Sequence, residues 1–173
     1  MVGIRGMRME DARGVAEVRV RGWQAAYAGL LPRSYLDGMS VEEDAALRRR
    51  LLVDGRGQVA NLVAVDEGGD VVGWAALGAG REAGARAAPG AGELYALYVR
   101  PELVGTGIGR ALIGAVHEEA GRRAMPELLL WVLEGNARAR AFYERAGYAC
   151  DGVARPDEYD GVVAVEVRYR RGL

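Results

Sequence analysis

Residues 93–121 read ELYALYVRPELVGTGIGRALIGAVHEEAG. The apolar run from Leu94 to Val99 is short and rich in aromatic and branched side chains, which predicts a strand buried on both faces. Pro101 ends this strand, and glycines follow at positions 105, 107 and 109. Apolar residues then recur at helical spacing. They are Ile108, Ala111, Leu112, Ala115 and Val116. The stretch predicts a strand, a glycine loop and a helix.

The glycine loop is the part of this stretch that indicates a ligand. Glycines adopt positive φ angles and carry no side chains, so N–H groups can converge on a phosphate at the positive end of a helix dipole. A P-loop needs a lysine after its glycines, and the chain contains no lysine. A dinucleotide-binding fingerprint that starts at Gly105 would need a third glycine where Arg110 stands. The loop therefore predicts an anion site outside these two classes.

A second motif, NARARAFYERAGY, occupies residues 136–148. Asn136 is a favoured N-cap residue, apolar residues follow at helical spacing, and Gly147 suits the position that ends a helix. These features predict a short helix on structural grounds alone. Asn136 and Tyr143 are separated by about two helical turns, so they share a face of it.

Together the two motifs resemble those of the GNAT superfamily of acyl-CoA-dependent N-acetyltransferases. The loop matches the family's pyrophosphate motif, Arg/Gln-x-x-Gly-x-Gly/Ala, except that Val104 stands where the family has Arg or Gln. The second motif matches Asn-x-x-Ala-x-x-Phe-Tyr-Glu-x-x-Gly-Phe except at its last residue, Tyr148. The resemblance follows the whole chain in the order of its elements, and its specific residues lie between Glu93 and Tyr148.

The resemblance implies an α+β fold that binds acetyl-CoA. It implies one domain over residues 1–173, with three α/β/α layers and a mixed, mostly antiparallel sheet of six or seven strands. The two central strands, Leu94 to Val99 and Leu128 to Leu133, are expected to splay apart and expose backbone groups to pantetheine. The implied coenzyme-binding residues are Leu97, Tyr98, Val99, Val104, Gly105, Thr106, Gly107, Ile108, Gly109, Arg110, Asn136 and Tyr143.

The implied reaction is direct transfer of an acetyl group to a primary amine of a small molecule or peptide, within a ternary complex. Tyr143 is the expected proton donor to the leaving thiolate. Glu93 stands at the family's position for a general base; the alternative is a water chain, with Glu93 merely beginning its strand. Asn136 holds the pantetheine arm, caps its own helix or does both. Arg110 either contacts a CoA phosphate or faces solvent.

Two other functions stay open. A CoA-binding sensor or scaffold without turnover would keep both motifs, and Val104 is the motif residue that favours it. A nucleotide-binding module would need an affinity for NAD or ATP above that for CoA. Release of free CoA with a panel of amines separates the enzyme from the sensor.

The composition excludes several classes of binding partner. The net charge is −1 and the isoelectric point about 6.0, which predicts no binding to nucleic acid or to an anionic membrane. One cysteine and one histidine are too few for a zinc site built from these ligands, so no metal is expected. We expect Cys150 to be a half-buried thiol of a cytoplasmic protein and His117 an ordinary helix-surface residue. Whether the chain forms a homodimer stays open.

Three further segments have a simple structural interpretation. Val41 to Leu52 predicts a helix whose early acidic residues and late arginines are explained by a solvated face. Residues 78–92 have no periodicity and predict a mobile loop, and residues 155–161 predict a turn-rich acidic connection.

The sequence gives weaker evidence about the residues that surround the acetyl acceptor. Trp23, Tyr27 and Tyr35 are interpreted as packing residues in the core or at its rim. Four carboxylates lie in segments that border the acceptor pocket in the family, and they predict a cationic acceptor. They are Asp37, Asp157, Glu158 and Asp160.

Overall fold

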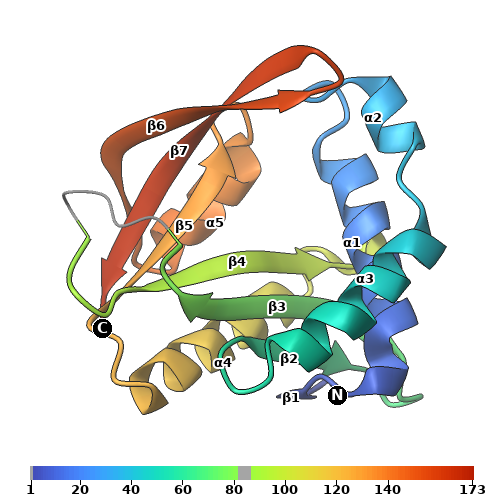
Figure 1. Ribbon diagram of the computed structural model, residues 1–173, viewed down its shortest axis with the longest axis horizontal. Coiled ribbons are helices and arrows are strands. Elements are labelled where there is room, and N and C mark those ends of the chain that lie inside the picture. Colours follow the sequence, from blue (N-terminus) through green and yellow to red (C-terminus); the bar gives the residue numbers. More distant parts are fainter. Residues whose placement is uncertain (1, 82–86) are drawn as a thin grey trace.

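The computed structural model describes residues 2–81 and 87–173, and it shows a seven-stranded sheet between two layers of helices (Figure 1). The strands are β1 (Gly3–Gly6), β2 (Ala60–Val65), β3 (Val71–Ala79), β4 (Gly92–Val99), β5 (Glu127–Leu133), β6 (Ala149–Tyr159) and β7 (Val162–Gly172). Their order is β1-β2-β3-β4-β5-β7-β6, and all pairs are antiparallel except β4 with β5. The predicted fold is confirmed.

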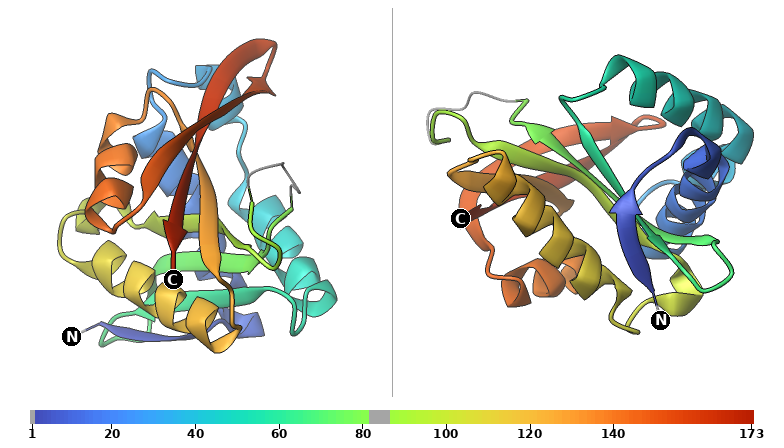
Figure 2. Two further views of the ribbon diagram at one scale, coloured as in Figure 1. Left: turned by 90° about the vertical axis from the view of Figure 1, so that its left-hand side faces the viewer. Right: turned by 90° about the horizontal axis from the view of Figure 1, so that it is seen from below.

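The helices form a layer on each face of the sheet. They are α1 (Ala12–Ala26), α2 (Arg33–Asp37), α3 (Val41–Asp54), α4 (Ile108–Arg122) and α5 (Ala137–Arg145), with 3-10 turns at Met9–Asp11 and Pro101–Leu103. Figure 2 shows α4 and α5 on one face and α1 and α3 on the other. In the described residues, every helix is too short or too polar to cross a lipid bilayer.

Among the described residues, two apolar clusters hold these layers together, and a third packs Trp23, Tyr27 and Tyr35 against Leu36 and Tyr159, as predicted for these three residues. On the α4 side, Leu112 and Val116 are fully buried in a cluster with Leu128 of β5. On the α1 side, Val15 packs in a separate cluster with Trp74 of β3. Burial of a large apolar side chain stabilises a fold by about 1.5–3 kcal/mol, so the sheet is held from both faces.

The apolar stripe of α4 differs from its prediction by one position. Ile108, Leu112 and Val116 are buried as expected, but Ala111 is exposed and Ile113 is buried instead. The row that faces the sheet repeats every four residues. Ala111 and Ile113 are each rotated by about 100° from Leu112, in opposite directions, and only Ile113 lies on the side that packs into the core cluster.

Helix α3 does not have the purely solvated polar face that its charge order predicts. Ser40 caps the helix by accepting a hydrogen bond from the N–H of Glu43 at 3.2 Å. Asp44, however, is only 7% exposed, and the Arg48 guanidinium lies 5.2 Å from the centre of the Trp74 ring. Helix α3 packs against α1, and this contact buries one polar edge of the helix.

The predicted turn-rich connection at residues 155–161 is wrong. Strand β6 continues to Tyr159, and only Asp160 and Gly161 form the turn to β7, with φ angles of +47° and +77°. Two consecutive positive φ angles are typical of a type I′ hairpin turn, and Asp-Gly is a strong sequence signal for it. The hairpin reaches α2 (Figure 1), where the Ser34 hydroxyl donates to Asp160 at 2.8 Å.

Two predictions concern exposed segments. Cys150 is exposed rather than half-buried, because it lies on β6, the edge strand of the sheet. The predicted loop at residues 78–92 is shorter than expected, since β3 extends to Ala79 and β4 begins at Gly92. Its predicted mobility involves residues 82–86, which lie outside the described residues.

Candidate active site

The two central strands separate after a short paired segment. Residues 92–94 of β4 pair with residues 128–130 of β5, and in the described chain these strands form no further pair. Strand β3 stays paired with β4 as far as Val99, and β5 continues against β7. From residue 95 to residue 99, the edge of β4 that faces β5 therefore carries backbone groups that the sheet does not use. The predicted splay is confirmed.

This separation changes the burial of β4. Leu94 is buried, but residues 95–99 are only half-buried, because the neighbouring strand has diverged. The prediction of a strand buried on both faces is wrong for this segment. The ladder with β3 also shifts at Tyr95, since Ala96 pairs with Ala76 whereas Leu94 pairs with Leu77. Such an unpaired edge can hydrogen-bond an extended ligand that carries amide groups.

The loop before α4 presents backbone to its surroundings. Gly105 and Gly107 have φ angles of +93° and +97°, a conformation that other L residues rarely adopt. A Cβ atom at either position would meet nothing within 4 Å, so the space beside the loop is open. Gly107 is the N-cap of α4 and provides no side-chain cap, which leaves the first-turn N–H groups available. The loop thus suits a phosphate group.

The other loop residues have different surroundings. Val104 is 41% exposed, and Arg110 is also exposed. The Thr106 hydroxyl donates to a carbonyl within its own turn at 2.6 Å. Gly109 serves packing, since a Cβ atom there would lie 3.4 Å from the Phe142 ring of α5. The glycine loop is therefore seated directly against α5.

Helix α5 carries the two polar residues singled out in the second motif. Asn136 caps the helix, because its side-chain oxygen accepts a hydrogen bond from the N–H of Ala139 at 3.1 Å. Tyr143 packs edge-on against Phe142 and Tyr148, with ring centres 5.2 and 5.8 Å apart. Within residues 2–81 and 87–173, the Tyr143 hydroxyl has no hydrogen-bond partner. It is therefore free to meet a ligand.

Three phenols come together where β4 diverges from β5. Burial raises the pKa of Tyr143, and the neighbouring phenols of Tyr98 and Tyr148 raise it further. Burial also raises the pKa of Tyr98 on β4 and of Tyr27 at the end of α1. The phenols of Tyr98 and Tyr143 raise the pKa of Tyr27 further. All three phenols are thus protonated at neutral pH, so Tyr143 can donate a hydrogen bond or a proton.

Glu93 lies apart from these phenols. It is only 3% exposed and belongs to the paired part of β4, five residues before Tyr98, which is roughly 16 Å along an extended strand. Its carboxylate accepts hydrogen bonds from the backbone N–H of Arg81 at 2.9 Å and from the guanidinium at 2.5 Å. Sequence reasoning missed Arg81, which follows β3 and carries no local signal of this pairing. The structure does not bring Glu93 and Tyr143 together.

The four carboxylates predicted to attract the acceptor are dispersed. Asp37 is exposed and paired with an arginine of its own helix, and Glu158 is exposed. Asp157 accepts a hydrogen bond from the Tyr159 hydroxyl at 2.7 Å. Of these four residues, Asp160 lines the cavity that lies between α1, α2 and α3.

His117 is not the ordinary surface residue that its position on α4 predicts. It is half-buried, its Nε2 lies 3.0 Å from the Tyr148 hydroxyl, and Arg171 packs against the same imidazole. Burial, helped by the Arg171 charge, lowers the pKa of His117 to about 4, so the ring is neutral at pH 7. This contact links α4 to the residue that follows α5. The sequence does contain one signal of this contact, which is the hydroxyl of Tyr148 at a position where the superfamily motif has phenylalanine.

Comparison with known proteins identifies relatives of the whole chain. The model of the acetyltransferase (GNAT) family matches residues 23–148, a span that includes the glycine loop and α5. YuaI of Bacillus subtilis (strain 168), an uncharacterized N-acetyltransferase, is 31% identical over 168 residues, which cover 96% of this chain and 91% of that protein. The mycothiol acetyltransferase of Streptomyces avermitilis is 45% identical over 60 residues, but the match covers 34% of this chain and 19% of that protein.

The fold has close counterparts among solved structures. The PaiA N-acetyltransferase from Thermoplasma acidophilum, in complex with coenzyme A, superposes with a TM-score of 0.79. The match covers 100% of this chain and 99% of that chain at 20% identity, which is a likeness of fold.

Proposed function

The chain belongs to the acetyltransferase (GNAT) family and is an acyltransferase, and on this premise we propose that it transfers an acetyl group from acetyl-CoA directly to a primary amine of a small molecule or peptide. Transfer takes place in a ternary complex, without a covalent enzyme intermediate. The observation that carries the proposal is the divergence of β4 from β5 between the open glycine loop and the unpartnered hydroxyl of Tyr143.

The residues of the coenzyme side fit acetyl-CoA in two ways. The unused backbone groups of residues 95–99 match the amides of a pantetheine arm. The N–H groups of residues 105–109 match a pyrophosphate, and Arg110 stands next to them in the first turn of α4. Val104 carries no charge, so the proposal assigns most of the phosphate binding to backbone groups.

The chemistry requires a proton to leave the ammonium form of the acceptor, a second proton to leave the nitrogen after attack, and a proton to reach the sulfur. The neutral amine nitrogen attacks the thioester carbon, the carbon–sulfur bond breaks, and the thiolate takes a proton from Tyr143, while the nitrogen of the new amide gives up a proton that restores the Tyr143 phenol through water. Backbone N–H groups near residues 97–99 stabilise the oxyanion that develops on the carbonyl. Since an alkyl amine with a pKa near 10.4 is only about 0.04% neutral at pH 7, the site must also remove a proton from the acceptor.

Glu93 is the proposed base for that proton. Its place on β4 supports the assignment, while its pairing with Arg81 opposes direct contact with the amine. Because Glu93 also lies apart from Tyr143, the assignment requires water to relay the proton from the amine to Glu93. A water chain that bypasses Glu93 is the alternative, and a Glu93→Gln variant that keeps the wild-type pH profile of kcat/KM would favour it.

The test of the proposed function is release of free CoA from acetyl-CoA in the presence of a panel of primary amines, with CoA binding measured by calorimetry. We expect CoA to bind and at least one amine to be acetylated at its nitrogen, as mass spectrometry would show. Binding without turnover across the panel would favour a sensor or scaffold instead. Failure to bind CoA would overturn both functions.

A further inference from the structure

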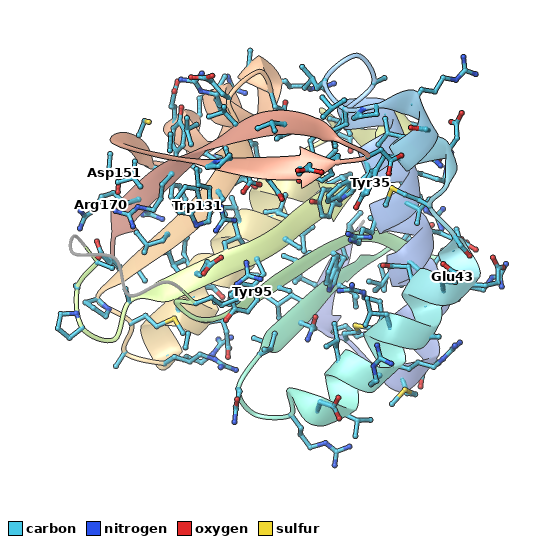
Figure 3. The ribbon with its side chains drawn as sticks, turned by 45° about the horizontal axis from the view of Figure 1, so that its top comes forward. Tyr35, Glu43, Tyr95, Trp131, Asp151 and Arg170 are labelled. Carbon is cyan, nitrogen blue, oxygen red and sulfur yellow. The ribbon has the colours of Figure 1, made fainter. Side chains whose placement is uncertain are left out.

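A cavity of about 380 Å³ lies on the acceptor side of the molecule, between α1, α2, α3 and the tip of the β6–β7 hairpin. Its volume is in the range of small-molecule sites. Figure 3 shows Tyr35 below the hairpin tip and Glu43 at the start of α3. The residues that matter here are Arg19, Ser34, Tyr35, Glu43, Asp44 and Asp160.

The lining of this cavity is acidic. Glu43 and Asp160 are exposed at its rim, and neither forms an ion pair with any residue that the structure describes. The single lining cation, Arg19, is already paired with Asp44 at 3.0 Å and lies over the ring of Trp23 at 4.8 Å. With Arg48, which also contacts Asp44, the three carboxylates and two guanidinium groups of this cluster leave one uncompensated negative charge.

A second observation concerns Asp44, the buried carboxylate among the lining residues. Asp44 is only 7% exposed, so it is more than nine-tenths buried. Its Oδ1 accepts hydrogen bonds from the guanidinium groups of Arg19 and Arg48. Its Oδ2 has no hydrogen-bond partner among the described residues. A buried carboxylate oxygen without a donor is costly, so a ligand or water that donates hydrogen bonds here is favoured.

The spacing of these carboxylates argues against a metal ion. In the described part of the chain, no three acidic, histidine or cysteine side chains are close enough to hold one ion. An extended organic cation, with several donors along its length, satisfies separated acceptors better than a compact ion does.

Aromatic rings extend from the cavity toward the end of α1. Tyr35 lines the cavity and packs against Tyr159 with ring centres 5.0 Å apart and against Trp23 at 6.2 Å. Trp23 in turn packs edge-on against Tyr27, which follows α1, with ring centres 4.9 Å apart. Apolar ring surfaces along this path suit an aliphatic chain.

We propose that this cavity binds the far end of the acetyl acceptor, which is therefore an extended aliphatic amine with a second ammonium or guanidinium group. One amine reacts beside Tyr143, the chain follows the aromatic rings, and the second cation is held by Glu43 and Asp160, with Asp44 below them. The inference rests on the proposed function, because it names the acceptor of that reaction.

The test compares matched amines that differ only in the second charge, n-octylamine and 1,8-diaminooctane, and shorter and longer pairs of the same kind. We expect the diamine to have a kcat/KM at least tenfold above that of the monoamine at the best chain length. In a Glu43→Gln/Asp160→Asn double variant, this ratio should fall about tenfold, mainly through the KM of the diamine. Equal ratios in wild type and variant would overturn the inference.

Glu42→Gln is the matched control. Glu42 precedes Glu43 in the same helical turn, but it is paired with Arg13 and does not line the cavity, so the ratio should not change. Because both substituted rim residues are exposed, unchanged melting temperatures should show that the variants are folded.

The failure of this inference differs from failure of the proposed function. If monoamines and diamines are acetylated equally well, the enzyme stands and the subsite is wrong. If no amine is acetylated, calorimetry with 1,8-diaminooctane alone still tests whether the cavity binds a diamine. Binding to the wild-type protein that weakens in the double variant supports the site, and absence of binding overturns it.

Discussion

The coenzyme side and the acceptor side of this molecule are built in different ways. In the function that we propose, the coenzyme side takes its binding groups from two short segments, residues 104–110 and 136–143, and from one strand edge, and most of these groups are backbone N–H. The acceptor side assembles side chains from α1, α2, α3 and the β6–β7 hairpin, which are distant in sequence. One side depends on chain geometry, and the other depends on the identity of individual side chains.

This difference indicates where each side should be sensitive to mutation. Backbone binding should tolerate changes of exposed side chains but not changes of backbone conformation. A side-chain site should behave in the opposite way, since removing one charge changes its ligand. Tyr143 lies between the two sides, because it comes from the coenzyme motif while its hydroxyl joins the phenols of the acceptor side.

The largest effect is expected at Tyr143. Tyr143→Phe keeps the ring that packs against Phe142 and removes only the hydroxyl. We expect kcat to fall about 100-fold, the lower part of the range for general acid catalysis, while the Kd for CoA changes less than about twofold. Steady-state kinetics and calorimetry measure the two quantities. Tyr148→Phe is the control, since it removes a neighbouring hydroxyl that contacts His117. An unchanged kcat in the Tyr143 variant would remove it from the proton-donor role.

A smaller effect is expected at the glycine loop. Gly107→Ala forces a Cβ onto a residue with φ of +97°, and such strain costs about 1–3 kcal/mol. The loop should relax and its N–H groups should turn away, so we expect the Kd for CoA to rise about tenfold in calorimetry. Gly114→Ala, in the open interior of α4, is the control and should leave the Kd unchanged while stabilising the helix. Equal affinities in both variants would contradict a backbone-held pyrophosphate.

The same contrast explains what could be predicted from the sequence. The order of strand, glycine loop and helix and the cap at Asn136 follow from local patterns of glycine, proline and apolar spacing, whereas the splay follows only from the resemblance to the superfamily. The structure confirms all three. The Arg81–Glu93 pair, the cavity beside Asp44 and the contact of His117 with Tyr148 join residues that are far apart in sequence or lie on different elements. No local pattern specifies which charged residue will meet which, because that depends on the packing of helices against the sheet.

Asn136 offers a way to separate two roles that the sequence leaves open. Aspartate is as good an N-cap as asparagine, so Asn136→Asp should keep the stability, whereas Asn136→Ala should lower the free energy of unfolding by about 1 kcal/mol in urea titrations. If the amide also holds the pantetheine arm, both variants should raise the Kd for CoA about threefold. We expect this pattern. A change of Kd in the alanine variant alone would assign Asn136 to capping only.

The last effect concerns His117, which contacts Tyr148 next to the coenzyme side. Its pKa of about 4 is below the value of about 6.5 expected in the unfolded chain, so the unfolded state binds more protons between these pH values. The stability that this group contributes is therefore complete above pH 6.5 and is lost as the pH falls toward 4.

Because His117 is half-exposed, we discount the full shift for solvent screening and expect about 1 kcal/mol. Between pH 7.5 and pH 4.5, the free energy of unfolding of the wild type should fall by about 1 kcal/mol more than that of His117→Gln, as urea titrations would show. Glutamine keeps a polar group near Tyr148 and does not titrate. Carboxylates with lowered pKa, such as those of Glu119 and Glu127, lose their stabilisation in both proteins and cancel in this difference. Equal losses would mean that the link between α4 and Tyr148 does not depend on a neutral imidazole. The coenzyme side would then owe its arrangement to backbone and apolar packing alone.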